Sequence, residues 1–278
     1  DLRMSRGLGD VYKRQIVLTV LTFGMTSCDM DKMPYDAIPA EEALTTIVGF
    51  EEARAGIYSV YLGLTGGSYV LAPEVQADAF NAVADFSNKY GELHRWTFES
   101  TNSTVETIWA NCYAAIGRAN FFIDGVGKID ENPEIELTEI QKQQINVYEG
   151  EAYFTRAYCY FYLATLFCRD YDVATAANTP GLPLQVKYEP KLAATQYPGR
   201  SSLEDTYKQI LEDLEEAEVR IETAKNGIAD YDRYINGAYV TVNTAPKNCG
   251  NYITVDVVTA LNCLLYTSPS PRDMRRSR

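Results

Sequence analysis

The segment from residue 138 to residue 167 constrains the fold more than any other part of the sequence. Its apolar residues form two stripes at helical spacing, where a helix on a protein surface has one. A helix that is apolar over so much of its circumference must be buried between neighbouring helices. The first stripe contains Val147, Phe154, Tyr158 and Phe161, and the second contains Tyr153, Ala157, Tyr160, Ala164 and Phe167.

Single apolar stripes predict further helices over residues 40–64, 105–123 and 201–221, and another apolar run covers residues 252–262. The sequence therefore predicts an all-α fold of about five helices, most of them paired, because paired amphipathic helices stack well. Such pairs are typical of a scaffold of the tetratricopeptide type, although the 34-residue consensus of that repeat is not visible.

Local signals mark the ends of these elements and the gaps between them. Ser201 and Glu204 match the S-x-x-E capping box of a helix start. Residues 65–104 have no clear period and contain Gly, Asn and Asp residues, so they are predicted to form a long irregular loop. Loops of this length in compact domains usually carry a function or are mobile.

Two charged residues fall inside the most apolar helix. Glu151 and Arg156 are five residues apart, so they are not neighbours on one helix face. Buried charges need partners, and each is predicted to pair with a polar group on a facing helix. Asp213 is predicted to serve helix contacts and not a ligand.

The charge of the chain excludes some classes of partner. The net charge is −13, and residues 28–262 alone hold 17 basic and 35 acidic residues, a net charge of −18. A surface this acidic disfavours nucleic acid and anionic lipid headgroups, whereas neutral glycans or peptides stay open as ligands.

Neither a metal site nor a cofactor is expected. The six cysteines show no CxxC spacing, and His94 is the only histidine, so no Cys/His zinc pattern can be built. Cys112 lies in a helical apolar stripe and is predicted to be a buried, free thiol. No disulfide framework is predicted.

The first part of the chain resembles a secretion signal. An apolar run covers residues 16–24 and leads into Met25-Thr26-Ser27-Cys28, which resembles a bacterial lipobox. Residues 1–27 are therefore interpreted as a signal peptide and Cys28 as the lipidated first residue of the mature protein. Residues 28–39 would form the tether. The alternative is a buried strand that ends in a chance cysteine.

The two ends of the sequence resemble translated sequencing-adaptor sequence. Residues 1–15 make a poor charged leader, and residues 263–278 break a helical pattern abruptly into Ser, Pro and Arg. Both are interpreted as artefactual, and the alternative is a pair of disordered basic tails. Residues 40–262 are then expected to form one helical domain that is truncated at its C-terminal end.

No catalytic signature is present in the sequence: there is no GxSxG, HExxH or Walker loop. A pair of glycosidase carboxylates stays open among the many acidic residues, but most of these lie on solvated helix faces. Aromatic rings stack on sugars, and amides or carboxylates bind their hydroxyls. Residues Asp78, Asn81, Tyr90 and Trp96 of the irregular segment are therefore predicted to bind a glycan, with an ordinary loop as the alternative.

Four blocks of sequence, in this order, resemble the SusD-like (RagB/SusD) family of surface nutrient-binding lipoproteins. They are GFEEARAGIY (49–58), W-x-x-x-Y-x-x-I-x-R-A-N (109–120), EAYFTRAYCYFYL (151–163) with PGLPL (180–184), and RSS (200–202) with Y-x-x-I-x-x-D-L-x-x-A (207–217). Together with the lipobox they cover most of residues 28–262.

The resemblance implies a scaffold of tetratricopeptide-like pairs, anchored by lipid to the outer membrane and facing outward. Such proteins cover a SusC-like, TonB-dependent transporter and hold oligosaccharide for import, which they bind and do not cleave. The chain is thus expected not to be an enzyme. From the resemblance, the family's C-terminal region, which normally contributes part of the ligand surface, is expected to be missing from this sequence. Glycan contacts vary among members, so no motif assigns them.

Two other functions stay open from the sequence. The first is an all-helical, glycan-degrading lipoprotein enzyme at the same location. The second is an interaction scaffold that holds a protein partner and binds no sugar.

Overall fold

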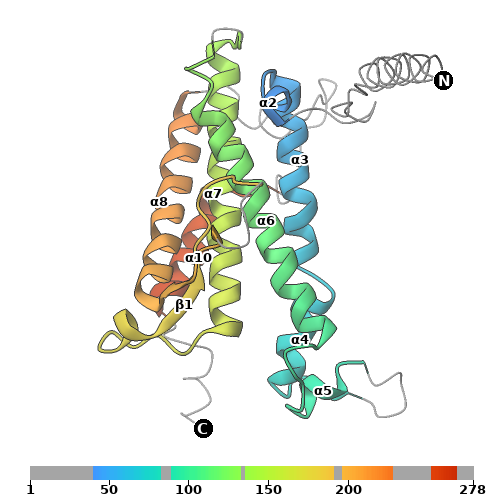
Figure 1. The fold of residues 1–278 in the computed structure, drawn as a ribbon. Helices are drawn as coiled ribbons and strands as arrows, with labels where there is room; N and C mark the ends of the chain where they lie inside the picture. Colours follow the sequence, from blue (N-terminus) through green and yellow to red (C-terminus); the bar gives the residue numbers. More distant parts are fainter. Residues whose placement is uncertain (1–39, 83–88, 133–134, 191–195, 228–251, 268–278) are drawn as a thin grey trace, which may run out of the picture. The chain divides into compact units, whose positions relative to one another are not determined.

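A computed structural model describes residues 40–82, 89–132, 135–190, 196–227 and 252–267. The chain divides into two units, residues 1–42 and 43–278. The short helix at residues 40–43 crosses this limit, and the other helices described belong to the second unit. The described residues of this unit are mostly helical, as predicted (Figure 1). The elements are α2 (Ala40–Ala43), α3 (Ile47–Leu64), α4 (Ser68–Gln76), α5 (Gly91–His94), α6 (Ser103–Gly127), α7 (Glu139–Phe167), the 3₁₀-helix η1 (Ala176–Asn178), β1 (Pro180–Pro183), β2 (Arg200–Ser202), α8 (Leu203–Gly227) and α10 (Val255–Thr267).

Helix α7 is the centre of the packing, as its two apolar stripes predicted. It packs against α3, α6 and α8, and α6 and α8 lie along it in Figure 1. Its start is fixed by a capping box, in which the Gln141 backbone N–H donates to Thr138 Oγ1 and the Thr138 N–H donates to Gln141 Oε1. Neighbours on several sides therefore bury α7 along most of its length.

Large aromatic side chains fill the space between α3, α6 and α7. Tyr160 and Phe154 of α7 are fully buried, and so are Phe50 of α3 and Phe122 of α6. The rings of Phe50 and Phe122 meet edge to face, with centroids 5.7 Å apart. Each such side chain contributes about 1.5–3 kcal/mol when it leaves water. Cys112 is also completely buried, which confirms its predicted place in the core.

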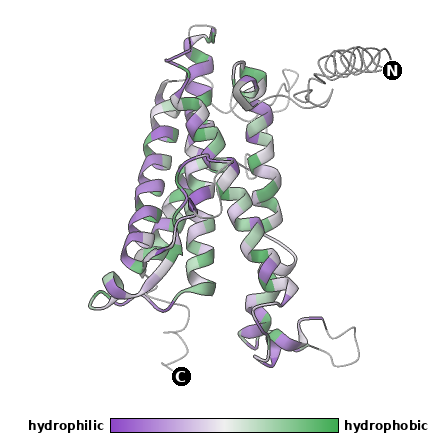
Figure 2. Cartoon of the chain, viewed as in Figure 1, coloured by the Kyte–Doolittle hydropathy of each residue, from purple (hydrophilic) through white to green (hydrophobic). Residues whose placement is uncertain are grey.

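Helix α8 has one apolar face, and Figure 2 shows hydrophilic residues along much of the rest. Ile210, Leu214 and Ile221 are buried on that face, as the single stripe predicted. Gly150 allows α7 and α8 to approach closely, because a Cβ there would lie 2.8 Å from Cγ1 of Ile221 and 3.1 Å from the carbonyl oxygen of Ala217.

Buried ion pairs connect α7 to its neighbours. Arg54 of α3 donates two hydrogen bonds of 2.6 Å to the Glu151 carboxylate. Arg156 donates to the two carboxylate oxygens of Asp213 in α8, at 2.8 and 2.6 Å. These contacts confirm that Glu151 and Arg156 pair across helices and that Asp213 serves helix packing.

Burial and pairing act in opposite directions on these groups. Burial raises the pKa of Asp213, and the hydrogen bonds and charge of Arg156 oppose that rise. Burial would lower the pKa of Arg156, but its hydrogen bonds to Asp213 and the charge of that carboxylate outweigh burial and raise it. The guanidinium therefore stays charged.

Two predicted helix boundaries are wrong. Residues 40–64 do not form one helix, because Thr46 breaks the run and caps α3, with its Oγ1 accepting from the Gly49 N–H. The capping box predicted from Ser201 and Glu204 does not form, and Ser202 caps α8 instead. Ser202, not Ser201, accepts from the backbone N–H three residues later, while the Ser201 hydroxyl donates to the carbonyl oxygen of Leu182 in β1.

The segment predicted as one long irregular loop, residues 65–104, contains two short helices, α4 and α5. Pro73 lies inside α4 and Gly67 precedes it with a φ of 56°, while α5 has only four residues. Neither helix therefore has the long apolar period that reveals a helix in sequence. Short helices of this kind are set by tertiary contacts.

Near the C-terminal end, α10 packs against α8. It continues past the predicted domain limit at residue 262 to Thr267, while residues 268–278 lie outside the described part of the chain. The domain limits at residues 28, 40 and 262 stay predictions. In the part of the chain that the structure describes, no helix has the length and apolar character to span a bilayer.

Candidate functional site: the α4–α5 surface

Residues 68–82 and 89–98, which we call the α4–α5 surface, contain all four residues that the sequence predicted to bind a glycan. Helix α4 is fixed to the scaffold through Tyr69. The Tyr69 hydroxyl accepts a hydrogen bond from the Asn111 amide of α6, and the Tyr162 hydroxyl of α7 donates to the Tyr69 carbonyl oxygen. Tyr69 itself is buried, so its ring belongs to the core.

Helix α5 is anchored in two ways. Leu93 points into the core and is 2% exposed. Tyr90, which precedes the helix, forms a hydrogen bond of 2.8 Å between its hydroxyl and the hydroxyl of Ser68 at the start of α4. The two short helices are thus held against each other, and the residues around them have a defined position.

Three of the four predicted residues have a left-handed backbone conformation. Asp78, Tyr90 and Trp96 have φ values of 60°, 60° and 57°, and no other non-glycine residue in the described ranges has a positive φ. Such a conformation is uncommon for a bulky side chain. It costs on the order of 1–3 kcal/mol per residue, and such residues concentrate at functional sites.

The predicted residues are largely exposed to solvent. The Asp78 side chain is 73% exposed and Trp96 is 55% exposed. Asn81 is also exposed, and Tyr90 is partly buried. The Trp96 ring lies 6.2 Å from the Phe98 ring, at an angle of 45°. The residues of this surface therefore include an accessible aromatic face, a carboxylate and an amide, a combination that suits a sugar ring and its hydroxyls.

The structure adds residues to this surface that the sequence prediction did not select. His94 Nδ1 lies 4.0 Å from Oδ1 of Asp78, which brings the loop after α4 next to α5. Phe80 is 54% exposed on the same segment. The hydroxyl contact that holds Tyr90 comes from Ser68. Phe80 and His94 were visible in the sequence as part of the mixture of aromatic and polar residues in this segment, but no sequence signal pointed to Ser68.

No group of three or more His, Cys, Asp or Glu side chains is placed to hold a metal ion among the described residues. Cys28 and the predicted tether lie outside those residues, so lipidation stays a prediction from the sequence.

Comparison with known proteins places this scaffold in a family. A model of SusD-like proteins, described as starch-binding and associating with the outer membrane, matches residues 44–224. The chain belongs to the SusD-like family. The match begins in the unit that contains α3 and ends near the C-terminal end of α8, so it includes the whole α4–α5 surface.

Individual proteins of known sequence or structure are similar to this chain. SusD-like protein P2 of Formosa agariphila is 26% identical over 200 residues, which are 66% of this chain and 37% of that protein. A SusD superfamily protein from Bacteroides thetaiotaomicron has a TM-score of 0.53 at 17% identity, over 81% of this chain and 43% of that one. A SusD-like carbohydrate binding protein from Bacteroides vulgatus has a TM-score of 0.51 at 20% identity, over 80% and 41%.

At these identities the solved SusD-like structures support the fold. The chain spans less than half the length of the relatives it matches. The ligand and partners of the whole SusD-like protein are therefore proposals, taken up next.

Proposed function

We propose that this chain is part of a surface lipoprotein that binds oligosaccharide at the outer membrane without cleaving it. In this proposal the protein is anchored by lipid on Cys28 and delivers its ligand to a SusC-like, TonB-dependent transporter. The family's description as starch-binding and associated with the outer membrane supports the ligand class and the location.

The observation that carries the proposal is the α4–α5 surface. Asp78, Tyr90 and Trp96 are held in left-handed conformations that disfavour folding, and two of them are largely exposed. The packing of Leu93 and the contact between Tyr90 and Ser68 hold this arrangement in place. A rigid arrangement reduces the entropy lost on binding, so these residues suit direct contact with a sugar.

Titration calorimetry with a panel of oligosaccharides tests the proposal. The panel contains maltohexaose, laminarihexaose, cellohexaose and xylohexaose, titrated into the complete protein. Trp96→Ala should weaken binding of the preferred sugar by at least tenfold, because it removes the exposed aromatic face. Val173→Ala changes an apolar side chain that is 86% exposed elsewhere and serves as the control. Unchanged affinity in Trp96→Ala would reject the α4–α5 surface as the site.

The rival functions predict different results. A glycan-degrading enzyme would release new reducing ends from the bound polysaccharide, and would stop doing so when one of two facing carboxylates is replaced. A pure interaction scaffold would co-purify with a transporter and bind no sugar of the panel. Binding without turnover favours the proposal over both.

The lipid anchor has its own test. Cells that express the complete gene would be labelled with an alkyne analogue of palmitate. Label on the natural protein and its loss in Cys28→Ser would support the anchor. Equal labelling of both would place the lipid elsewhere, and no labelling of either would contradict the anchor.

A further inference from the structure

A pocket lies far along the sequence from the α4–α5 surface. Residues 184–190, which we call the pinned loop, follow strand β1 and run over α6 and α7 without forming a strand. An irregular segment has no ladder to satisfy its backbone groups, so side chains must do so. Here the side chains of two helices hold one edge of the loop.

The contacts of the pinned loop are numerous for its length. The Tyr160 hydroxyl both donates to the Gln185 carbonyl oxygen and accepts from the Gln185 N–H, at 2.8 and 2.7 Å. The Asn120 amide donates to the carbonyl oxygens of Gln185 and Lys187, at 2.8 and 3.2 Å. Asn120 and Tyr160 are themselves buried, so these bonds are shielded from water and fix the loop.

Further contacts hold the rest of the loop. Arg156 donates to the Val186 carbonyl oxygen at 3.2 Å, and the Tyr188 N–H donates to the Asp124 carboxylate at 2.7 Å. The Tyr188 ring meets Phe121 of α6 edge to face, with centroids 5.0 Å apart. The backbone of the pinned loop therefore has little conformational freedom.

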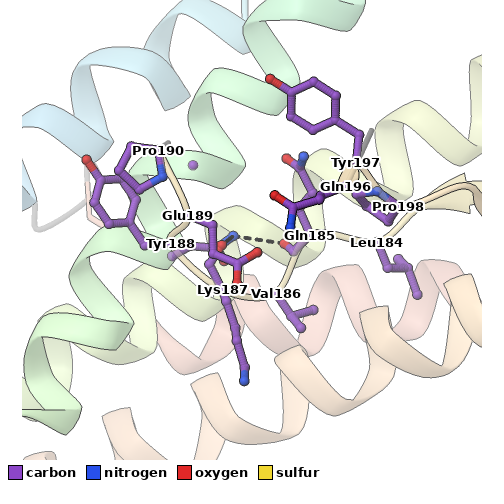
Figure 3. Close-up of a pocket in the computed structure, with 12 residues that line it drawn as sticks. Leu184, Gln185, Val186, Lys187, Tyr188, Glu189, Pro190, Gln196, Tyr197 and Pro198 are labelled. Carbon is purple, nitrogen blue, oxygen red and sulfur yellow. Dashed lines mark hydrogen bonds between the residues drawn. The ribbon is translucent and has the colours of Figure 1, made fainter. Parts of the chain in front are cut away.

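The pinned loop borders a pocket of about 490 Å³. Pockets of about 300–1,000 Å³ are typical of small-ligand sites. Figure 3 shows Tyr197 at one end of the pocket and Tyr188 with Pro190 at the other. The polar side chains of Gln185, Gln196 and Glu189 lie between them. Aromatic rings at both ends and hydrogen-bonding groups between them suit a short chain of sugar rings.

Gly117 of α6 also lines the pocket. No close contact with another described residue requires a glycine at this position. A Cβ added there would meet no atom within 4 Å. A glycine inside a helix costs about 1 kcal/mol relative to alanine. The missing side chain leaves the pocket floor open instead of making room for another helix, as Gly150 does.

We propose that the pocket between the pinned loop and α6 is a second saccharide site, separate from the α4–α5 surface. The ligand is an uncharged oligosaccharide segment. The lining has one carboxylate, Glu189, and one ammonium, Lys187, so it offers no excess charge for an ionic ligand. The acidic chain further disfavours anions. The proposal shares the ligand class of the proposed function but none of its residues.

Variants at Gly117 test the second site. Gly117→Phe places a ring in the pocket. The matched control Gly63→Phe adds the same ring at an exposed glycine of α3, where an added Cβ meets no atom within 4 Å. The same four hexasaccharides are titrated into the complete protein with Trp96→Ala in the background, so that binding at the α4–α5 surface is removed. We expect residual binding of at least one sugar, weakened at least tenfold by Gly117→Phe and retained in Gly63→Phe.

Tyr197→Ala is the second probe, because Tyr197 is 59% exposed and its loss should not disturb folding. It should weaken the residual binding in the same way. If Trp96→Ala alone removes all binding, the second site is rejected and the proposed function stands. If Trp96→Ala has no effect and Gly117→Phe removes binding, the second site stands and the α4–α5 surface is rejected. If no sugar of the panel binds the natural protein, both are rejected.

Discussion

Two buried ion pairs hold α7 to its neighbours, but their surroundings differ. Arg54 of α3 pairs with Glu151 of α7, and Arg156 of α7 pairs with Asp213 of α8. The Arg54 guanidinium lies over three tyrosine rings, 5.4 Å from the Tyr58 centroid, 4.3 Å from Tyr148 and 4.4 Å from Tyr252. Tyr252 begins the segment that leads into α10, and the Ile253 N–H donates to the Tyr58 hydroxyl at 2.9 Å. This pair thus joins α3 and α7 to the far end of the described chain.

The Arg156 pair lies among polar groups. Arg156 also donates to Asn120 Oδ1 at 2.8 Å, and Asp213 accepts from the Gln209 amide at 2.9 Å. Through Asn120 and the Val186 carbonyl oxygen the network reaches the pinned loop. The comparison indicates that the aromatic pair stabilises the scaffold alone, while the polar pair also shapes a surface.

The largest expected effect is the loss of one partner of the polar pair. Arg156→Met should lower the free energy of unfolding by about 3–5 kcal/mol, because it leaves the Asp213 charge buried without its guanidinium. It should also release the Val186 carbonyl oxygen. Denaturant unfolding followed by far-UV circular dichroism measures the change.

Lys208→Met is the control for this variant. Lys208 lies in α8, the helix that contains Asp213, but is 71% exposed and contacts Glu212 at 3.8 Å. A surface pair of this kind contributes little, so the free energy of unfolding should stay nearly unchanged. Equal losses in Arg156→Met and Lys208→Met would contradict the importance of the buried network.

Glu149 of α7 is a third buried carboxylate, and it makes stability depend on pH in a way that the two ion pairs do not. Burial raises the pKa of Glu149 to about 7, Glu216 adds to the rise and Arg220, 3.0 Å away, opposes it. The folded state therefore holds this proton more tightly than the unfolded chain. The free energy of unfolding should fall as pH rises from about 4.5 to about 7.

Glu149→Gln tests this dependence. Between pH 4.5 and pH 8, the free energy of unfolding should fall by about 3 kcal/mol less in the variant than in the natural protein, because a shift of one pKa unit corresponds to about 1.4 kcal/mol. Glu151 and Asp213 remain in both proteins, so the difference between the two curves isolates Glu149. Parallel curves for the natural protein and the variant would show that Glu149 is ionised in the folded state at low pH.

Replacing both partners of an ion pair by apolar residues should affect stability differently at the two pairs. Arg54→Met with Glu151→Leu leaves aromatic neighbours that accept apolar side chains. The Tyr58 hydroxyl keeps the Ile253 N–H although it loses its hydrogen bond to Glu151, and Tyr148 loses its hydrogen bond to Arg54. Arg156→Met with Asp213→Leu leaves the Asn120 and Val186 oxygens without their donor. A buried unsatisfied group costs about 1–3 kcal/mol, so the second double variant should be less stable than the first by about 2 kcal/mol.

The same denaturant titrations decide this comparison. Equal stability of the two double variants would mean that the polar surroundings of Arg156 add nothing to its pairing with Asp213. A lower stability for the Arg54 double variant would reverse the comparison.

The sequence revealed the helices and the need for partners, but not the partners themselves. The two stripes of residues 138–167 predicted a buried helix, and α7 is one. They could not indicate that Glu151 meets Arg54, because the two are 97 residues apart and many basic residues were available. The pinned loop was also hidden, since the residues that hold it come from two separate helices.

The candidate site was predictable in composition and not in conformation. An aromatic residue in a polar loop is visible in the sequence, and Trp96 is exposed as a ligand contact must be. Its left-handed backbone was not, because that region favours Gly, Asn and Asp over tryptophan. Only the packing around α5, through Leu93 and Tyr90, gives such a residue its position.

The smallest expected effect comes from Gly117, one turn before Asn120 in the polar network. Gly117→Ala should raise the free energy of unfolding by about 1 kcal/mol, because alanine favours the helix and its methyl group meets no described atom within 4 Å. Gly150→Ala is the matched control in α7, where the methyl group would lie 2.8 Å from Ile221 and should destabilise the protein by about 1–3 kcal/mol. Thermal and denaturant unfolding measure both. A loss in Gly117→Ala would mean that the space above α6 is filled in the folded protein, which would also argue against an open pocket beside the Arg156 network.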